Sequence, residues 1–217
     1  MSFLVKSIYR LLNIPWVYRL SQSLLAPGGE KELHSQIGQM VSFFSSGLRH
    51  LDVGCGPSSL FWKHGLDPVG IDLSYPYLLH FVKRGKQAVN GSCISLPFQT
   101  NTFDCVWSIG LLHHLPEYFA RLAVNEMIRV TANMGHVVIV DNVLPQRRFH
   151  RPIAWLLRKL DRGRYVRDQN QLEKLLPDRP AWRCERFSYS LYNLECLRCM
   201  YQKTTLPPRN TTNSTIK

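Results

Sequence analysis

Two glycines and an acid carry the clearest chemical signal in this sequence. One apolar run ends in Leu51-Asp52-Val53-Gly54-Cys55-Gly56, and a second, Val69-Gly70-Ile71-Asp72, ends in an acid 18 residues after Gly54. Glycine lets the backbone turn sharply and lets a ligand approach closely. A carboxylate that ends the next strand can accept hydrogen bonds from a ribose diol. The pattern therefore predicts a site for a nucleoside-bearing cofactor.

The spacing disfavours a dinucleotide. A dinucleotide fingerprint has a third glycine three positions after the second, where the first helix packs beneath a pyrophosphate. This chain has Ser59 at that position. A nucleotide-dependent oxidoreductase remains an alternative, and tight binding of NADH would favour it.

A parallel sheet would bring these two loops to one edge. Apolar runs alternating with helical periodicity predict strands over 49–53, 68–71, 88–90, 103–108 and 136–140, and helices over 30–44, 58–64, 74–84 and 116–130. Runs 182–188 and 195–201 predict an antiparallel pair. The predicted fold class is α/β, a Rossmann-like doubly wound sheet, mostly parallel with an antiparallel C-terminal strand, plus N-terminal helices.

Four stretches, in this order, resemble one family. They are Leu51-Asp52-Val53-Gly54-Cys55-Gly56, Gly70-Ile71-Asp72-Leu73-Ser74, Leu96-Pro97-Phe98 followed by Asn101-Thr102-Phe103-Asp104, and Leu111-Leu112-His113-His114-Leu115. From about Leu51 to Asp141 the chain resembles the class I S-adenosylmethionine-dependent methyltransferases, most of all the group that acts on small molecules, lipids and quinones.

The resemblance implies S-adenosyl-L-methionine as cofactor and gives each matching residue a role. The backbone at Gly54, Cys55 and Gly56 would contact the methionine part, with Asp52 near its ammonium. Asp72 would bind the ribose hydroxyls. The remaining implied contacts are Leu73, Ser92 and Cys93 at the adenine, and Ser108 and Ile109 at the methionine side near the sulfonium.

Two positions depart from the family pattern. The family often has an acid where this chain has Ser92, and a neutral hydrogen bond in its place would weaken cofactor binding by about 1 kcal/mol. Asn133-Met134-Gly135 replaces the usual Pro-Gly-Gly turn. Asparagine tolerates the left-handed conformation that such a turn uses, so we expect the turn to persist.

The acceptor side has three candidate groups. His113 or His114 could act as a base, because histidine titrates near neutrality. Both histidines could instead cap the helix that starts at Pro116 or pack beneath the loop. Asp141, at the end of the fifth predicted strand, is a candidate for acceptor contact.

The chain's charge is concentrated in one segment. The net charge is +12, and residues 147–167 contain eight basic residues and one acid, a net +7. Apolar and aromatic residues alternate with these bases, which suits either an anionic, lipid-linked acceptor or a membrane surface. A solvated cationic helix is the alternative. Arg147 and Arg148 are the predicted substrate-side residues in this segment.

Three regions are predicted along the chain. Residues 1–46 would be N-terminal amphipathic helices, of which 1–25 either pack on the domain or contact a membrane surface. Residues 47–203 would be the methyltransferase domain with the basic insertion 147–167, and 204–217 a disordered tail. The six cysteines do not predict a disulfide framework, and Cys196-x-x-Cys199 has no second pair to complete a zinc site. We expect no metal.

The predicted function is methyl transfer from S-adenosyl-L-methionine to a small or lipid-linked acceptor by in-line displacement. The predicted location is the cytoplasm, with peripheral membrane contact as a further option. Two alternatives stay open: a non-catalytic S-adenosylmethionine-binding partner or scaffold subunit, and an RNA methyltransferase. Nucleic acid is the weaker expectation, because Ser108-Ile109-Gly110-Leu111 lacks the polar-Pro-Pro-aromatic motif found in methyltransferases that act on base amino groups.

Overall fold

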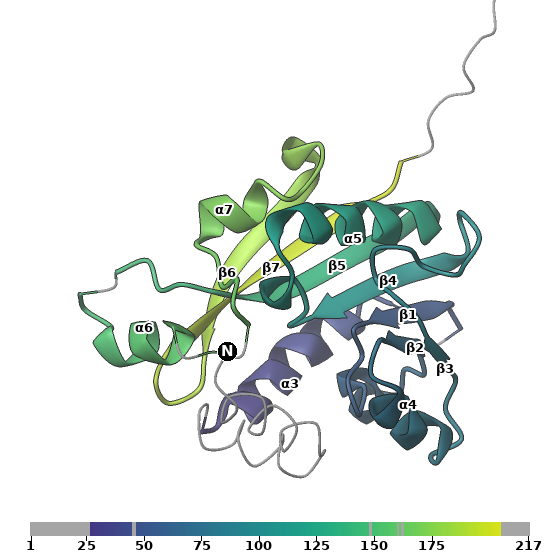
Figure 1. Cartoon of the computed structure of the whole chain (residues 1–217), viewed down its shortest axis with the longest axis horizontal. Coiled ribbons are helices and arrows are strands. Elements are labelled where there is room, and N and C mark those ends of the chain that lie inside the picture. Colours follow the sequence, from purple (N-terminus) through teal and green to yellow (C-terminus); the bar gives the residue numbers. More distant parts are fainter. Residues whose placement is uncertain (1–26, 45–46, 148, 160, 162, 205–217) are drawn as a thin grey trace, which may run out of the picture.

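The computed structural model describes residues 27–44, 47–147, 149–159, 161 and 163–204. The predicted segment 1–25, Arg148 and nearly all of the predicted tail therefore lie outside the described residues. Seven strands form one sheet in the order β3-β2-β1-β4-β5-β7-β6 (Figure 1). The strands are β1 (His50–Val53), β2 (Val69–Asp72), β3 (Ala88–Asn90), β4 (Phe103–Ile109), β5 (Thr131–Val143), β6 (Trp182–Tyr189) and β7 (Leu194–Gln202).

Strand direction confirms the predicted fold class. Strands β1 to β5 pair in parallel, and β7 runs antiparallel to both β5 and β6. Strand order reverses between β1 and β4, and in open α/β sheets ligands bind at the carboxyl ends of the strands beside such a reversal. The topology therefore places the glycine loop after β1 and the end of β4 at the predicted site.

Helices cover both faces of the sheet (Figure 1). They are α3 (Gly29–Val41), α4 (Tyr75–Val82), α5 (Glu117–Val130), α6 (Pro152–Lys159) and α7 (Gln169–Glu173), with the 3-10 helices η1 (Leu60–His64), η2 (Leu112–His114) and η3 (Arg179–Ala181). None of the helices among the described residues is long and apolar enough to cross a bilayer.

Alternate residues of the central strands feed two separate cores. Val106 and Ile139 pack with Met127 of α5, whereas Trp107 and Val138 pack with Ile37 of α3. This period of two is what a strand buried on both faces requires. The seven-residue β4 is therefore apolar on both sides.

The helix α3 belongs to the main core. Ile37 and Met40 are fully buried against the same face of the sheet as Trp107 and Phe61. The boundary expected after residue 46 thus does not separate α3 from the domain, because its apolar stripe completes one of the two cores.

One cysteine pairing differs from the expectation. Cys184 and Cys199 lie opposite each other on β6 and β7 and form a disulfide. Cys196 stays a buried thiol on the other face of β7, with Sγ 3.3 Å from Asn142 Oδ1. The CxxC pair is thus split between two faces of a strand, as its spacing in a strand requires.

The turn expected at 133–135 is a bend within β5. Met134, and not Asn133, takes the left-handed conformation, with φ of 63°. Gly135 is needed for close packing, because a Cβ there would lie 2.8 Å from the carbonyl oxygen of Asp104. The two neighbours thus have different constraints.

These constraints predict opposite effects for two substitutions. Met134→Gly should raise the free energy of unfolding by about 0.5–1 kcal/mol, because it removes a left-handed non-glycine residue whose side chain is exposed. Gly135→Ala should lower it, because the new methyl group meets backbone. Urea unfolding of the two variants beside wild type measures both changes, and destabilisation by Met134→Gly would contradict the assignment.

Candidate functional site

The loop after β1 is held to the end of β2 by its own backbone. Gly54 N and Cys55 N both donate to the carbonyl of Ile71, at 2.8 and 3.2 Å. Gly54 and Gly56 have φ of 74° and 61°, which explains glycine at both positions. A Cβ added to Gly56 would meet no atom within 4 Å, so the backbone there is open to a ligand.

The carboxylate of Asp72 is fixed beside this loop. Its Oδ2 accepts from Gly56 N at 3.0 Å, and its Oδ1 accepts from Ser74 N at 2.8 Å. Each oxygen keeps further lone pairs, which is the capacity that binding two ribose hydroxyls requires. The structure thus brings Asp72 and the two glycines together as the sequence predicts.

Asn90 is a positioning residue that the sequence patterns did not single out. Its Nδ2 donates to the carbonyls of Asp72 and Leu73, at 3.0 and 3.1 Å. Leu73 is 71% exposed, which leaves its side chain free to cover a flat ring. Asn90 ends β3, so a polar residue there could have been recognised as a neighbour of Asp72 once β3 was placed beside β2.

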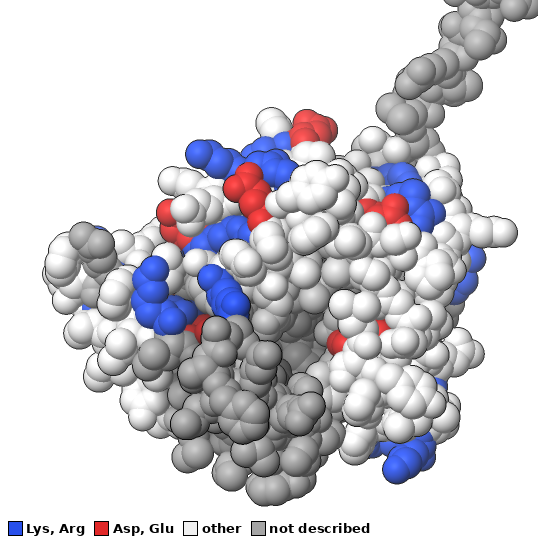
Figure 2. Space-filling model, in the orientation of Figure 1, with Lys and Arg blue, Asp and Glu red and all other residues white. Residues whose placement is uncertain are grey.

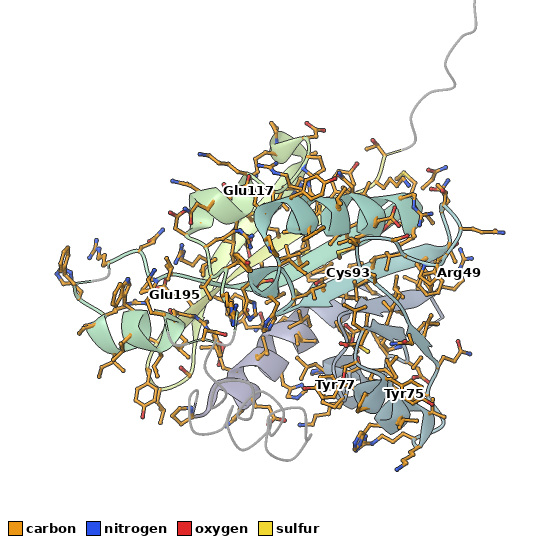
Figure 3. The ribbon with its side chains drawn as sticks, viewed as in Figure 1. Arg49, Tyr75, Tyr77, Cys93, Glu117 and Glu195 are labelled. Carbon is orange, nitrogen blue, oxygen red and sulfur yellow. A yellow bond between two sulfur atoms is a disulfide. The ribbon has the colours of Figure 1, made fainter. Side chains whose placement is uncertain are left out.

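The predicted adenine-side residues follow β3. Ser92 is half-buried and its Oγ accepts from Ile94 N at 3.4 Å. Cys93, labelled in Figure 3, is buried in the core with Ile71, and burial raises the pKa of its thiol. Ser92 is therefore the more accessible of the two.

Asp52 is buried below the glycine loop. Burial raises the pKa of its carboxyl to about 7, against the effect of a hydrogen bond from Ser59, and the charge of Asp72 adds to the increase. An unliganded site thus holds Asp52 close to its titration midpoint at neutral pH. A cationic group placed beside it would favour the ionised form.

Two predicted residues at the end of β4 lie deeper than expected. Ser108 is fully buried, and its Oγ has no hydrogen-bond partner among the described residues. Ile109 is half-buried within the α3-side core. Leu111 covers the glycine loop instead, since a Cβ on Gly54 would lie 2.9 Å from Leu111 Cδ1.

The residues present fit the implied cofactor. An open glycine backbone, a fixed carboxylate at the end of β2 and an exposed apolar side chain at Leu73 lie in sequence along one edge of the sheet. The unpartnered Ser108 Oγ adds a buried polar atom at the end of β4. S-adenosylmethionine carries an amino acid, a ribose and an adenine, which match this series of groups.

On the acceptor side, Asp141 is buried and fully occupied. Its Oδ2 accepts from Leu112 N at 2.5 Å, and its Oδ1 lies 2.5 Å from His113 Nδ1 and accepts from Asn142 N at 2.7 Å. Burial would raise the pKa of Asp141, but His113 and the two N–H donors outweigh burial and lower it. Asp141, predicted as a candidate for acceptor contact, is almost fully buried, because its carboxylate holds the loop after β4.

His113 is enclosed between two acids. Its Nε2 lies 3.7 Å from Asp161 Oδ1, opposite the contact with Asp141. Burial alone would lower the pKa of His113, but the two carboxylates raise it. Both nitrogens of the His113 ring face carboxylates, so this geometry favours a positioning role for His113. His114 is exposed, with its ring centroid 4.2 Å from that of His113.

Asp161 and residues 163–167 form a strap over η2. Tyr165 N donates to the carbonyl of His113 at 3.0 Å, and Arg167 donates to the carbonyls of Leu112 and Leu115 at 2.8 and 2.7 Å. A Cβ on Gly163 would overlap the His113 ring. No local pattern in the sequence shows that these residues return to η2. From the sequence they could be recognised only as part of the positively charged segment.

Part of the basic insertion is structural. Arg151 pairs with Glu195 (labelled in Figure 3), as does Arg186 from β6. Arg158 and Arg167 are buried. Arg147 is exposed beside α6, which leaves it available to a ligand, and Arg148 lies outside the described residues. The charge of this segment is thus divided between internal contacts and the surface.

Comparisons with known proteins agree with this geometry. Residues 51–139 match the family described as methyltransferase domain. A human protein named "Probable tRNA methyltransferase 9B" is 31% identical over 101 residues, which are 46% of this chain and 22% of that protein. An uncharacterized protein of Methanocaldococcus jannaschii is 29% identical over 115 residues, 48% of this chain and 49% of that one. The chain therefore spans half or less of the length of these relatives.

A solved structure extends the likeness beyond the matched segment. The N-methyltransferase NodS from Bradyrhizobium japonicum, in complex with S-adenosyl-L-homocysteine, has a TM-score of 0.68 at 17% identity. The alignment covers 92% of this chain and 98% of that one. The shared fold thus extends well beyond residues 51–139. Over residues 51–139 the chain is therefore similar to the methyltransferase domain family, and over most of its length it shares the fold of an N-methyltransferase solved with S-adenosyl-L-homocysteine.

Proposed function

We propose that this protein transfers a methyl group from S-adenosyl-L-methionine to a small or lipid-linked acceptor. The observation that carries the proposal is the open glycine backbone at Gly56, hydrogen-bonded to Asp72, at the reversal of strand order. The cofactor, when bound, supplies an activated methyl group. The protein's residues would hold the cofactor and the acceptor in line and would stabilise the charges on both.

The cofactor would lie along the ends of β1, β2 and β4. Asp72 would accept the ribose hydroxyls, Leu73 would cover the adenine, and Gly54 and Gly56 would admit the methionine part. Asp52 would ionise beside the ammonium, which offsets the burial that raises its pKa. Ser92 would provide a neutral hydrogen bond at the adenine edge.

His114 is the better candidate for a base. It is exposed on η2, whereas His113 is enclosed by Asp141 and Asp161 and is favoured in the protonated form. We assign His113 to positioning, because it joins β5, η2 and the strap. His114 would accept a proton from an acceptor that must lose one on methylation.

RNA methylation is the second candidate. It is favoured by the partial likeness to the human protein named "Probable tRNA methyltransferase 9B". The net charge of the chain supports RNA binding less than its size suggests, because Arg151, Arg158 and Arg167 make internal contacts. A non-catalytic binding subunit would use the same cofactor residues without turnover.

The acceptor class is tested by turnover. Purified protein is incubated with methyl-labelled S-adenosylmethionine and with lipid, small-molecule or RNA fractions of cell extract. We expect label in the lipid or small-molecule fraction. Label confined to RNA would support the second candidate, and cofactor binding without turnover in any fraction would support the non-catalytic subunit.

Asp72→Ala should weaken binding of S-adenosylhomocysteine about tenfold or more, because the ribose loses two charge-assisted hydrogen bonds. Asp67→Ala is the matched control, since Asp67 is exposed and pairs only at the surface with Lys86. Calorimetry gives both affinities. An unchanged affinity in Asp72→Ala would mean that the ribose is bound elsewhere.

Cofactor affinity should increase with pH. Asp52 has a folded-state pKa of about 7, so below that pH its ionisation must accompany binding beside the cofactor's ammonium. We expect the affinity for S-adenosylhomocysteine to rise about tenfold from pH 5.5 to 7.5 and to level off above. In Asp52→Asn this rise should disappear. If the affinity of wild type did not change with pH, Asp52 would not be the group that binds the ammonium of the cofactor.

The two histidines should respond differently to substitution. His114→Ala should lower the turnover number with little change in thermal stability, because its side chain is exposed. His113→Gln should lower the melting temperature, because it removes the buried ring that pairs with the Asp141 carboxylate. Turnover on the active fraction and thermal melts distinguish these roles. The assignment would be reversed if His113→Gln lost turnover without losing stability while His114→Ala kept full activity.

A further inference from the structure

The helix α6 presents apolar side chains to solvent and its arginine to the interior. Ile153 and Leu156, about one helical turn apart, are 58% and 52% exposed, whereas Arg158 is buried. The Arg158 guanidinium donates to Tyr189 Oη at 3.0 Å and to the carbonyl of Glu195 at 2.8 Å. A helix that met only water would show the opposite arrangement. The outer side of α6 is therefore suited to contact with an apolar phase.

Neighbouring segments enlarge this surface. Phe149, which precedes α6, is 82% exposed, and Leu191 and Tyr192 in the β6–β7 turn are exposed as well. The turn lies beside α6 (Figure 1), because Ala154 of α6 packs on Leu194 of β7. We call the following residues the α6 face: Phe149, Ile153, Leu156, Leu191 and Tyr192. Soluble monomers rarely expose a large apolar patch without a partner.

Cationic side chains border the α6 face. Arg147 and Lys159 are exposed, and with His150, Phe149 and Trp155 they help to line an open cleft of about 570 Å³. On the side drawn in Figure 2, Lys and Arg also lie near α6, and around α7 they are mixed with Asp and Glu. Apolar residues bordered by Lys and Arg are the composition that binds the interface of an anionic membrane.

The N-terminal segment joins the body at the same place. The carbonyl of Pro27 accepts from Leu191 N at 2.9 Å, so the described chain starts beside the β6–β7 turn. Residues 1–26 contain three bases, Lys6, Arg10 and Arg19, and no acid, among many Leu, Ile, Trp and Tyr. Two segments of matching chemistry, far apart in sequence, are therefore connected to one end of the molecule.

We infer that the α6 face docks on a membrane surface that contains anionic phospholipid. Ile153, Leu156 and Phe149 would enter the boundary between headgroups and acyl chains, and Arg147 and Lys159 would contact lipid phosphates. This inference concerns a surface apart from the cofactor loop, and it holds whether the acceptor is a lipid or a soluble molecule.

Vesicle flotation of the full-length chain tests the inference. The probes are vesicles of phosphatidylcholine alone and vesicles in which part of it is replaced by phosphatidylglycerol. The variant Ile153→Gln/Leu156→Gln removes apolar area without adding charge. Its matched control is Leu79→Gln/Val82→Gln, which changes two exposed residues at the same spacing on α4, at the other side of the molecule (Figure 1). Lys159→Gln and Lys83→Gln form the corresponding pair for charge.

We expect wild type to float with the anionic vesicles and to be released by high salt. The α6 double variant should bind the anionic vesicles at least about tenfold more weakly than wild type, and the α4 double variant should bind like wild type. Lys159→Gln should bind more weakly than Lys83→Gln. Unchanged S-adenosylhomocysteine affinity in every variant shows that the fold is intact. The inference would be overturned if the two double variants bound equally, or if binding did not depend on lipid charge. It would also be overturned if wild type bound neither kind of vesicle, and that result would point to a protein partner for the α6 face.

Discussion

The buried carboxylate of Asp141 is the contact on which the acceptor side of this protein depends. It lies near the end of β5 and binds the backbone of η2, the ring of His113 and its own neighbour Asn142. Through His113 it also reaches Asp161 and the strap. A buried charge is tolerated only when it is paired and hydrogen-bonded, so these partners must assemble together. The loop after β4 is therefore fixed in place before any acceptor arrives.

The arginines of the insertion show how this assembly is completed. Arg167 binds two carbonyls of the η2 segment, and Arg158 joins α6 to β7 and to Asp161. These side chains replace backbone partners that a short loop cannot supply for itself. The positive charge of residues 147–167 thus has two parts: one stabilises the loops at the acceptor side, and the other, with Arg147 and Lys159, remains at the surface.

The sheet, its order of elements and the cofactor residues could be predicted from the sequence because they follow local rules. Period-two apolar runs identify the strands, and Gly54, Gly56 and Asp72 follow directly from strand ends. The contacts of Asp141 and Asp161 could not be predicted, because they join segments about 20 to 50 residues apart through irregular loops. Likewise, the helical spacing of apolar and basic residues predicts that α6 has two different faces, but it does not show which face is buried. At Met134, strand pairing in β5 imposed a left-handed residue that composition assigned to Asn133.

The end of β7 returns the chain to the amino-terminal part of β5, away from the cofactor loop. Lys203 exchanges backbone hydrogen bonds with Met134 and Gly135, and its Nζ donates to the carbonyls of Ile128 and Thr131, where α5 ends and β5 begins. Those are the amino ends of parallel strands, whereas ligands bind at the carboxyl ends. A fluorescent protein, affinity tag or surface linker fused after Lys203 would therefore leave the molecule on the side opposite its chemistry, and the protein could be immobilised with its cofactor edge facing solution.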